Sequence, residues 1–206
     1  MQFSVDVTGL EALAARLAAA GLSMERVRRM AINTVARKTM TRSRREIVTQ
    51  VNLKASYVKE RMTLKTATSA SPVAVITARR RATRLATYGA KQVTRAARRA
   101  KGDSRRGIGP GRKQAGVSVS VKAGGSRKRM DGAFFMPLRA GQAAGGNGMG
   151  VFVRTGSGRK AMKHLYGPSV DQVFRGVAAQ IVPDVKAELA REIQRLAAVQ
   201  LKKKGA

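Results

Sequence analysis

Apolar residues recur every three or four positions in two long stretches of this chain. The first stretch runs roughly from Met24 to Gln50, and the second opens at Ser169 and continues to about residue 201. Such spacing places the apolar side chains on one face of an α-helix. Pro183 interrupts the second stretch, and we expect it to kink or restart the helix because proline lacks a backbone N–H.

Shorter stretches alternate between apolar and polar residues, which is typical of strands with one buried face. Alternation is clearest at 117–121 (VSVSV), and 134–138 (FFMPL) is its expected return strand. The segment between them, 123–132, would then be the basic tip of a long hairpin. Further strands are expected at 3–7, 73–76 and 151–153, and further helices at 10–20 and 56–62.

Together these elements predict an α+β fold. Long N- and C-terminal helices would pack on a small, mainly antiparallel sheet with long basic loops. With 206 residues and an ordinary hydrophobic content, the chain is most simply one domain, 1–206.

The chain is strongly basic. It has 42 Lys and Arg against 11 acids, a net charge of +31. Residues 61–170 hold 24 of the cations and only two acids, Asp103 and Asp131. A field of this size repels copies of itself and attracts polyanions. We therefore expect the protein to work beside nucleic acid or inside an assembly that neutralises it.

The most basic part of the chain, 79–116, ends in KGDSRRGIGPGRKQ, which combines glycine, proline and charge. We expect this part to be a flexible loop or arm. The candidate residues for contact with nucleic acid or an acidic partner are Arg79, Arg80, Arg81, Arg84, Arg95, Arg98, Arg99, Arg105, Arg106, Arg112, Lys113, Arg127, Lys128 and Arg129.

Eight further cations lie on the first long helix. They are equally consistent with a solvated helix face and with a face that binds nucleic acid or a partner. Sequence-specific recognition of bases is not favoured, because the chain has no zinc-finger, zipper or aromatic RNA-binding signature. Basic residues without interleaved aromatics indicate contact with the phosphate backbone. Stacking on single strands would need more rings than Tyr88, which stands alone between residues 79 and 113.

Catalytic chemistry has little support in the sequence. The chain has no Cys, and His164 is its single His, with Asp171 the nearest acid in sequence. Gly156 to Ala161 (GSGRKA) departs from a phosphate-binding loop, which needs Gly before the Lys and Ser or Thr after it. We expect no enzyme activity, no cofactor and no metal.

The N-terminus lacks the features of a signal peptide, and no apolar run approaches the roughly 20 residues that span a bilayer. We therefore expect no membrane partner. The expected location is the host cytoplasm, unless a larger particle carries the chain out.

Three groups of segments, in order along most of the chain, resemble the phage minor tail protein Z family of tail-completion proteins. The segments are VDVTGLEALAARL (5–17), AINTVARK (31–38) running on to VNLKASYVKERM (51–62), then FFMPLRAG (134–141), VFVRTGSGRK (151–160) and LYGPSV (165–170). The arginine-rich middle, 79–113, departs most from what a tail component needs.

This resemblance implies a non-enzymatic structural protein of the virion at the head–tail junction, or neck. It implies a homo-oligomer, commonly a hexameric ring, next to the tail terminator and other neck or tail proteins. Such a ring finishes the tail and helps to position the DNA end. Six copies would carry about 186 positive charges, which DNA or acidic neighbours must neutralise.

Two other classes of function remain open at this stage. A stand-alone nucleic-acid binder of ribosomal or nucleoid type would suit the composition, and should bind as a monomer with steep salt dependence. An enzyme acting on nucleic acid would need a cluster of metal ligands that the sequence does not show.

Overall fold

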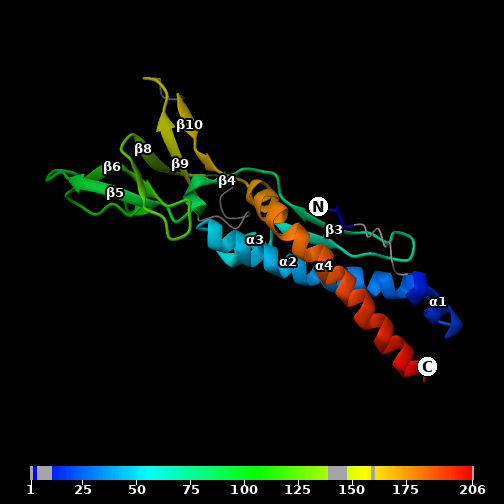
Figure 1. Cartoon of the computed structure of the whole chain (residues 1–206). Helices are drawn as coiled ribbons and strands as arrows, with labels where there is room; N and C mark the ends of the chain where they lie inside the picture. Colours follow the sequence, from blue (N-terminus) through cyan, green and yellow to red (C-terminus); the bar gives the residue numbers. More distant parts are fainter. Residues whose placement is uncertain (1, 4–10, 139–147, 159–160, 206) are drawn as a thin grey trace. The chain divides into compact units, whose positions relative to one another are not determined.

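The computed structural model describes residues 2–3, 11–138, 148–158 and 161–205 (Figure 1). Contacts between residues divide the chain into two compact units. Unit 1 consists of Met1–Glu46, Lys59–Arg79 and Phe174–Ala206, and unit 2 of Ile47–Val58 and Arg80–Val173. The single domain expected from the sequence stays a prediction, and each unit is described separately below.

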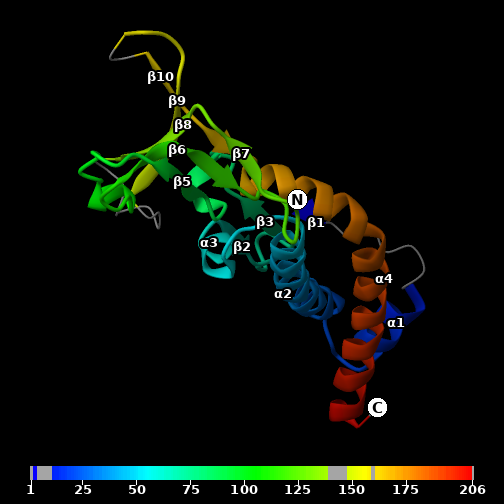
Figure 2. The same cartoon turned by 90° about the vertical axis from the view of Figure 1, so that its left-hand side faces the viewer.

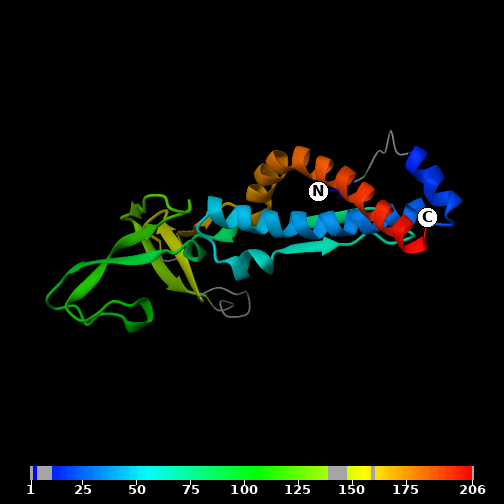
Figure 3. The same ribbon diagram turned by 60° about the horizontal axis from the view of Figure 1, so that its bottom comes forward.

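Unit 1 combines long helices with a three-stranded antiparallel sheet of order β1-β3-β2. Its strands are β1 (Gln2–Phe3), β2 (Met62–Lys65) and β3 (Ala74–Ala78). Its helices are α1 (Glu11–Ala19), most of α2 (Met24–Gln50) and most of α4 (Val170–Lys204). Figure 1 and Figure 3 show α2 running alongside β3, with α4 beside α2. The α+β prediction is confirmed, including long helices towards both ends of the chain.

The core of unit 1 forms where the apolar stripes of the helices meet the sheet. Ile193 on α4 and Ile76 on β3 are both fully buried, as is Leu17 on α1. A side-chain contact fixes α2 to the loop after β2: Asn33 Nδ2 donates to the carbonyl of Ala67, and the Ala67 N–H donates back to Asn33 Oδ1. This reciprocal pair satisfies a backbone donor and acceptor outside the sheet.

The buried face of α2 includes polar residues in its second half. Thr39 and Ser43 are 2% and 0% exposed, one helical turn apart. They continue the buried row from Val35 to Ile47, where the apolar periodicity of the sequence is interrupted. Small hydroxyl side chains therefore occupy core positions that the apolar pattern did not predict.

Two expectations for the segment after α2 need correction. Helix α3 (Ala55–Lys59) is shorter than the predicted 56–62 helix, and Met62 begins strand β2 instead. The side chain of Arg44 on α2 donates to the carbonyls of Lys59 and Met62, at 3.5 and 3.1 Å. The chain therefore leaves the helix and enters the sheet where Arg44 binds its backbone.

The expected strand at 3–7 and the start of the 10–20 helix lie partly outside the described residues. Within them, Gln2–Phe3 form β1 and α1 begins at Glu11. Most of the glycine-rich segment between 141 and 150 also lies outside, as do Arg159 and Lys160.

The described residues of unit 2 form eight strands in three small antiparallel sheets, and Figure 2 shows most of these strands together. Their orders are β5-β6-β7, β10-β9-β8 and β11-β4. The strands are β4 (Thr83–Arg84), β5 (Lys91–Ala96), β6 (Arg112–Val119), β7 (Lys128–Met130), β8 (Ala133–Pro137), β9 (Met149–Arg154), β10 (Met162–His164) and β11 (Tyr166–Gly167). Short 3-10 helices lie at η1 (Leu85–Thr87) and η2 (Ser104–Arg106).

The predicted hairpin between 117–121 and 134–138 is wrong. The strand β6 pairs with β5 on one side and with β7 on the other, while β8 pairs with β9. Residues 128–130, expected in the basic tip 123–132, are themselves strand β7. Strand pairing joins residues far apart in sequence, so alternation identified β6 but not its neighbours.

Residues 79–116, expected to form a flexible loop or arm, contain β4, β5 and the start of β6. Residues 91–96 and 112–116 of this segment therefore form a paired β-hairpin. Its flexibility stays a prediction.

Helix α4 begins with a reciprocal cap. The Gln172 N–H donates to Ser169 Oγ, and the Ser169 N–H donates to Gln172 Oε1. Each side chain thereby satisfies a backbone N–H of the first turn. The helix continues through Pro183 to Lys204, so the expected restart does not occur, and Figure 3 shows the helix curved.

Candidate nucleic-acid interface

The positive charge is divided unequally between the two units. Unit 2 holds 22 Lys and Arg against three acids, a net charge of +19, whereas unit 1 holds 20 against eight, a net charge of +12. Thirteen of the fourteen candidate contact residues lie in unit 2, and Arg79 alone lies in unit 1. The candidate interface is therefore a feature of unit 2.

The hairpin of β5 and β6 brings together the first group of cations. Arg95 lies directly opposite Lys113, and Ala96 opposite Arg112. Like charges at opposed positions destabilise a β-ladder, so the pair of Arg95 and Lys113 favours a counter-ion from outside the sheet. We call the cations of this hairpin and its connecting turn the hairpin group: Arg95, Arg98, Arg99, Arg105, Arg106, Arg112 and Lys113.

Backbone hydrogen bonds order the turn that connects the two strands. The Ala97 N–H donates to the Gly111 carbonyl at 2.8 Å, and the Gly111 N–H to the Ala100 carbonyl at 2.9 Å. Asp103 and Ile108 exchange both of their backbone bonds, at 2.7 and 2.9 Å. The arginines of the turn are thus displayed on a hydrogen-bonded backbone.

The second group of cations, Arg127, Lys128 and Arg129, lies on or next to β7, at the edge of the same sheet. We call it the β7 group. Its Arg129 occupies one row across all three strands with Ser118 and Lys91. Arg127 is held in place, since its Nη2 donates to the carbonyls of Gly89 and Ser118 at 2.6 and 2.8 Å.

Several candidate cations are already engaged within unit 2. Arg106 pairs with Asp103 at 3.3 Å and Arg129 with Asp131 at 2.5 Å, while Arg112 donates to Thr94. The acids of the basic segment, Asp103 and Asp131, are thereby occupied. Among the described residues, exposed cations whose side chains have no hydrogen bond or ion pair include Arg95, Arg98, Arg99, Arg105, Lys113 and Lys128.

The remaining candidates do not join these groups. Arg79 closes the sheet of unit 1, where its N–H donates to the Arg61 carbonyl at 2.9 Å. Arg80 and Arg81 are exposed in the segment that leads to β4, and Arg84 on β4 pairs with Tyr166 on β11. The candidate cations therefore do not form one continuous surface. They lie in the hairpin group, in the β7 group and in the segment around β4.

Two exposed lysines lie beside the candidate contact residues although the sequence did not single them out. Lys91 is exposed in the row that contains Arg129, and Lys101 is exposed in the turn of the hairpin group. Strand register would have been needed to select Lys91, and that information is not local in sequence.

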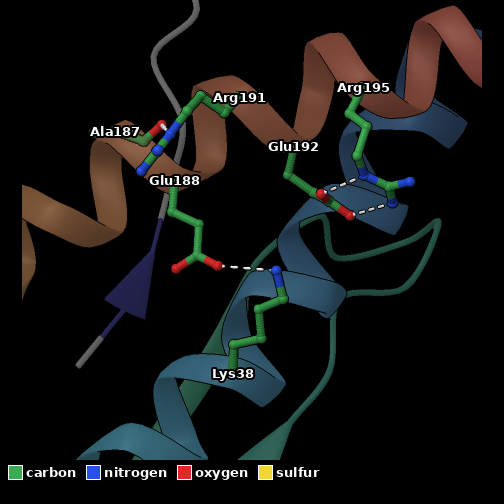
Figure 4. Close-up of polar contacts among 6 residues, drawn as sticks. All are labelled: Lys38, Ala187, Glu188, Arg191, Glu192 and Arg195. Atoms are coloured by element: carbon green, nitrogen blue, oxygen red, sulfur yellow. Dashed lines mark hydrogen bonds and ion pairs between the residues drawn. The ribbon is translucent and has the colours of Figure 1, made fainter.

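Two acids of α4 form ion pairs with cations of α2. Arg42 pairs with Asp184 at 2.7 Å and Lys38 with Glu188 at 3.0 Å, so the two helices are antiparallel here. One turn further, Arg195 donates twice to Glu192, at 2.8 and 2.7 Å (Figure 4). Three of the eight α2 cations, Lys38, Arg42 and Arg44, thus bind other parts of unit 1.

We expect Glu192 to make unit 1 sensitive to acid. The Glu192 side chain is 7% exposed, and the hydrogen bonds from Arg195 hold its pKa below the ordinary 4.5, aided by the charges of Arg195 and Lys38 against the opposing effect of burial. The stabilisation is present above pH 4.5 and lost as the pH falls through the lowered pKa. Glu192→Gln should cost about 1 to 2 kcal/mol at pH 7, a loss that shrinks in acid.

Thermal unfolding between pH 7 and pH 3 would test this expectation. Glu188→Gln is the matched control, because Glu188 pairs with an exposed lysine and should contribute about 0 to 1 kcal/mol. Equal stability of Glu192→Gln and the wild type at pH 7 would contradict it.

No group of three or more potential metal ligands occurs among the described residues. His164 stacks between the rings of Phe152 and Tyr166, each with a centroid 4.4 Å away. Burial lowers the pKa of His164 below 6.5, and the charge of Arg84 lowers it further. Within the described part of the chain, no helix has the length and apolar character needed to cross a membrane.

The family of the chain follows from comparison with known proteins. No curated protein and no solved structure matches it. A family model described as prophage minor tail protein Z matches residues 7–204, which is almost the whole chain. This chain therefore belongs to the prophage minor tail protein Z family and is a structural protein of a phage tail.

Proposed function

We propose that this protein completes the phage tail at the head–tail junction as one subunit of a ring. In this role it contacts DNA through phosphates, without reading bases. It has no catalytic step, and its basic sheet serves as a non-specific surface for the polyanion.

The observation that carries the proposal is the separation of charge between the units. Eight of the eleven acids lie in unit 1, whereas unit 2 has a net charge of +19 and exposed cations on the β5-β6-β7 sheet. A merely solubilising surface would mix both signs. A surface with a large excess of positive charge on an ordered sheet suits a partner that is itself a regular array of negative charge.

A ring is compatible with this charge only when a counter-charge is present. Neighbouring copies with +31 each repel one another over roughly a Debye length, about 8 Å at physiological salt. DNA in the lumen, or acidic faces of a tail terminator and other neck or tail proteins, would remove that repulsion. We therefore propose that the ring closes in the particle, and that the free protein in the host cytoplasm forms smaller oligomers or monomers.

Electron cryomicroscopy of purified particles would test the location, with this chain labelled by a small C-terminal tag. The expected result is density for a ring of this chain between head and tail. Particles in which the tag lies along the tail tube or at the distal tip, or from which the chain is absent, would contradict the proposal.

The charge of unit 2 also favours a second candidate, a stand-alone nucleic-acid binder. That protein would bind duplex DNA or RNA tightly as a monomer and would not need a particle. Analytical ultracentrifugation with and without a short duplex separates the two candidates. Higher-order assembly promoted by DNA supports the ring subunit, and a saturable complex of single monomers supports the alternative.

A further inference from the structure

Four aromatic rings form a continuous row across unit 2, although they are separated in sequence. Phe134 on β8 lies opposite Phe152 on β9, and Phe152 lies opposite His164 on β10. The ring centroids are 6.2 and 4.4 Å apart, and the Tyr166 ring follows His164 at 4.4 Å. These residues are called the ring row below.

The backbone beneath the ring row is adapted to it. A Cβ at Gly150 on β9 would lie 2.7 Å from the Phe152 ring and 2.8 Å from His164 Nε2. Only glycine at this position lets both rings lie against the strand. Burial and the charge of Arg84 lower the pKa of His164, which favours the neutral imidazole and suits stacking between aromatic neighbours.

The ring row is not fully buried, as an aromatic cluster in a core would be. Its last member, Tyr166, is 50% exposed and is the exposed large hydrophobic residue among the described residues. Phe134 and His164 are half-buried, so the row lies along a surface. Its open end can accept one more planar group.

The charges around the ring row indicate what that planar group carries. Arg84 lies opposite Tyr166 on the paired strands β4 and β11, and the Arg154 guanidinium lies 5.8 Å from the Phe134 centroid. A planar group joined to a negative charge fits this setting. An unpaired nucleotide has both parts, because its base stacks on aromatic rings and its phosphate pairs with arginine.

We propose that Tyr166 and Arg84 form a binding site for an unpaired nucleotide of single-stranded nucleic acid, with the base on Tyr166 and the phosphate at Arg84. This proposal adds a mode of binding to the proposed function and rests on its premise that the protein contacts nucleic acid. The proposed function concerns duplex DNA, whereas this site would take a single strand. The bases of a duplex are stacked on each other and are not available to an aromatic side chain.

The test uses the full-length protein with a fluorescent 15-nucleotide oligo-dT and, separately, a 15-base-pair duplex. Tyr166→Ala should weaken binding of oligo-dT by about fivefold to a hundredfold, the range for loss of one stacked base, and leave duplex binding unchanged. Tyr166→Phe should keep the wild-type affinity, because the ring remains. Arg84→Gln should weaken oligo-dT binding and lower its salt dependence by about one contact.

Intrinsic fluorescence gives a second readout, because the chain has three tyrosines and no tryptophan. Tyr88 is fully buried and Tyr57 half-buried, so Tyr166 is the tyrosine most open to a stacking base. Oligo-dT should quench the tyrosine emission of the wild type. In Tyr166→Phe the quenching should be lost while binding persists.

Several results would overturn the proposal. Equal weakening of oligo-dT and duplex binding by Tyr166→Ala would show a general change of fold or charge. Unchanged binding with impaired incorporation into particles would assign Tyr166 to a protein partner. If the wild type binds the duplex but not oligo-dT, the site is excluded while the proposed function stands; if it binds neither, both fail.

Discussion

Replacing Arg95, Arg98, Arg99 and Lys113 with glutamine is expected to weaken binding of duplex DNA by about 10- to 1,000-fold at moderate salt. These four cations of the hairpin group are exposed, and their side chains have no hydrogen bond or ion pair among the described residues. Removing one cation that binds a phosphate should reduce the slope of log K against log salt concentration by about 0.9. Fluorescence anisotropy over a salt series measures both quantities.

A variant with the same net charge is the matched control for this experiment. Arg16, Arg26, Arg37 and Arg45 are exposed cations of unit 1, and their replacement by glutamine also removes four charges. The hairpin variant should lose far more affinity than this control. If both variants lose affinity equally, net charge alone drives binding and the hairpin group is not the contact surface.

Tyr88→Ala is expected to destabilise unit 2 by about 3 to 5 kcal/mol, the cost of emptying a large buried aromatic site. Tyr88 is 0% exposed, and its hydroxyl donates to the carbonyl of Pro168 just before α4. Its ring also contacts Gly167, where a Cβ would come within 2.5 Å of Tyr88 Cε2. Tyr88 therefore links η1 to the start of α4 through both packing and a hydrogen bond.

Hydrogen exchange followed by mass spectrometry would locate the effect. Amides of β6 and β9 should lose protection in Tyr88→Ala, while α4 amides near Ile193 should change less. Tyr88→Phe keeps the ring and should cost only about 1 to 2 kcal/mol, for an acceptor left unpaired. Protection equal to the wild type in Tyr88→Ala would contradict this role.

Alkaline pH gives an independent check on Tyr88. Burial, the largest cause, raises the pKa of the phenol from 10.0 to about 12. Its contribution to stability is therefore complete below pH 10 and fades as the pH rises towards 12. Tyr88→Phe should remove this part of the alkaline decline.

The sequence argued against stacking on bases because the arginine-rich stretch has a single aromatic ring, and the ring row changes that conclusion. Only Tyr88 lies within the arginine-rich stretch, and its ring is buried. The rings of Phe134, Phe152, His164 and Tyr166 come from outside that stretch, and sheet register unites them. Aromatic residues need not alternate with basic residues in sequence to lie beside them in a fold.

Sequence alone determined the features that depend on near neighbours. The bounds of α2 at Met24 and Gln50 agree with the apolar periodicity, because a helix forms its hydrogen bonds four residues apart. Ser169 was recognisable as the start of α4 for the same reason. The excess of cations in the middle of the chain is likewise a property of composition, and the family resemblance rests on segments in sequential order.

Tertiary structure alone decided the features that depend on distant residues. It paired β6 with β7 in place of β8, buried Thr39 and Ser43, and gave Lys38 and Arg42 structural partners on α4. It also divided the charge between the units and assembled the ring row. Each of these results follows from contacts between segments that are separated in sequence, and local patterns of apolar and polar residues hold no information on which segments meet.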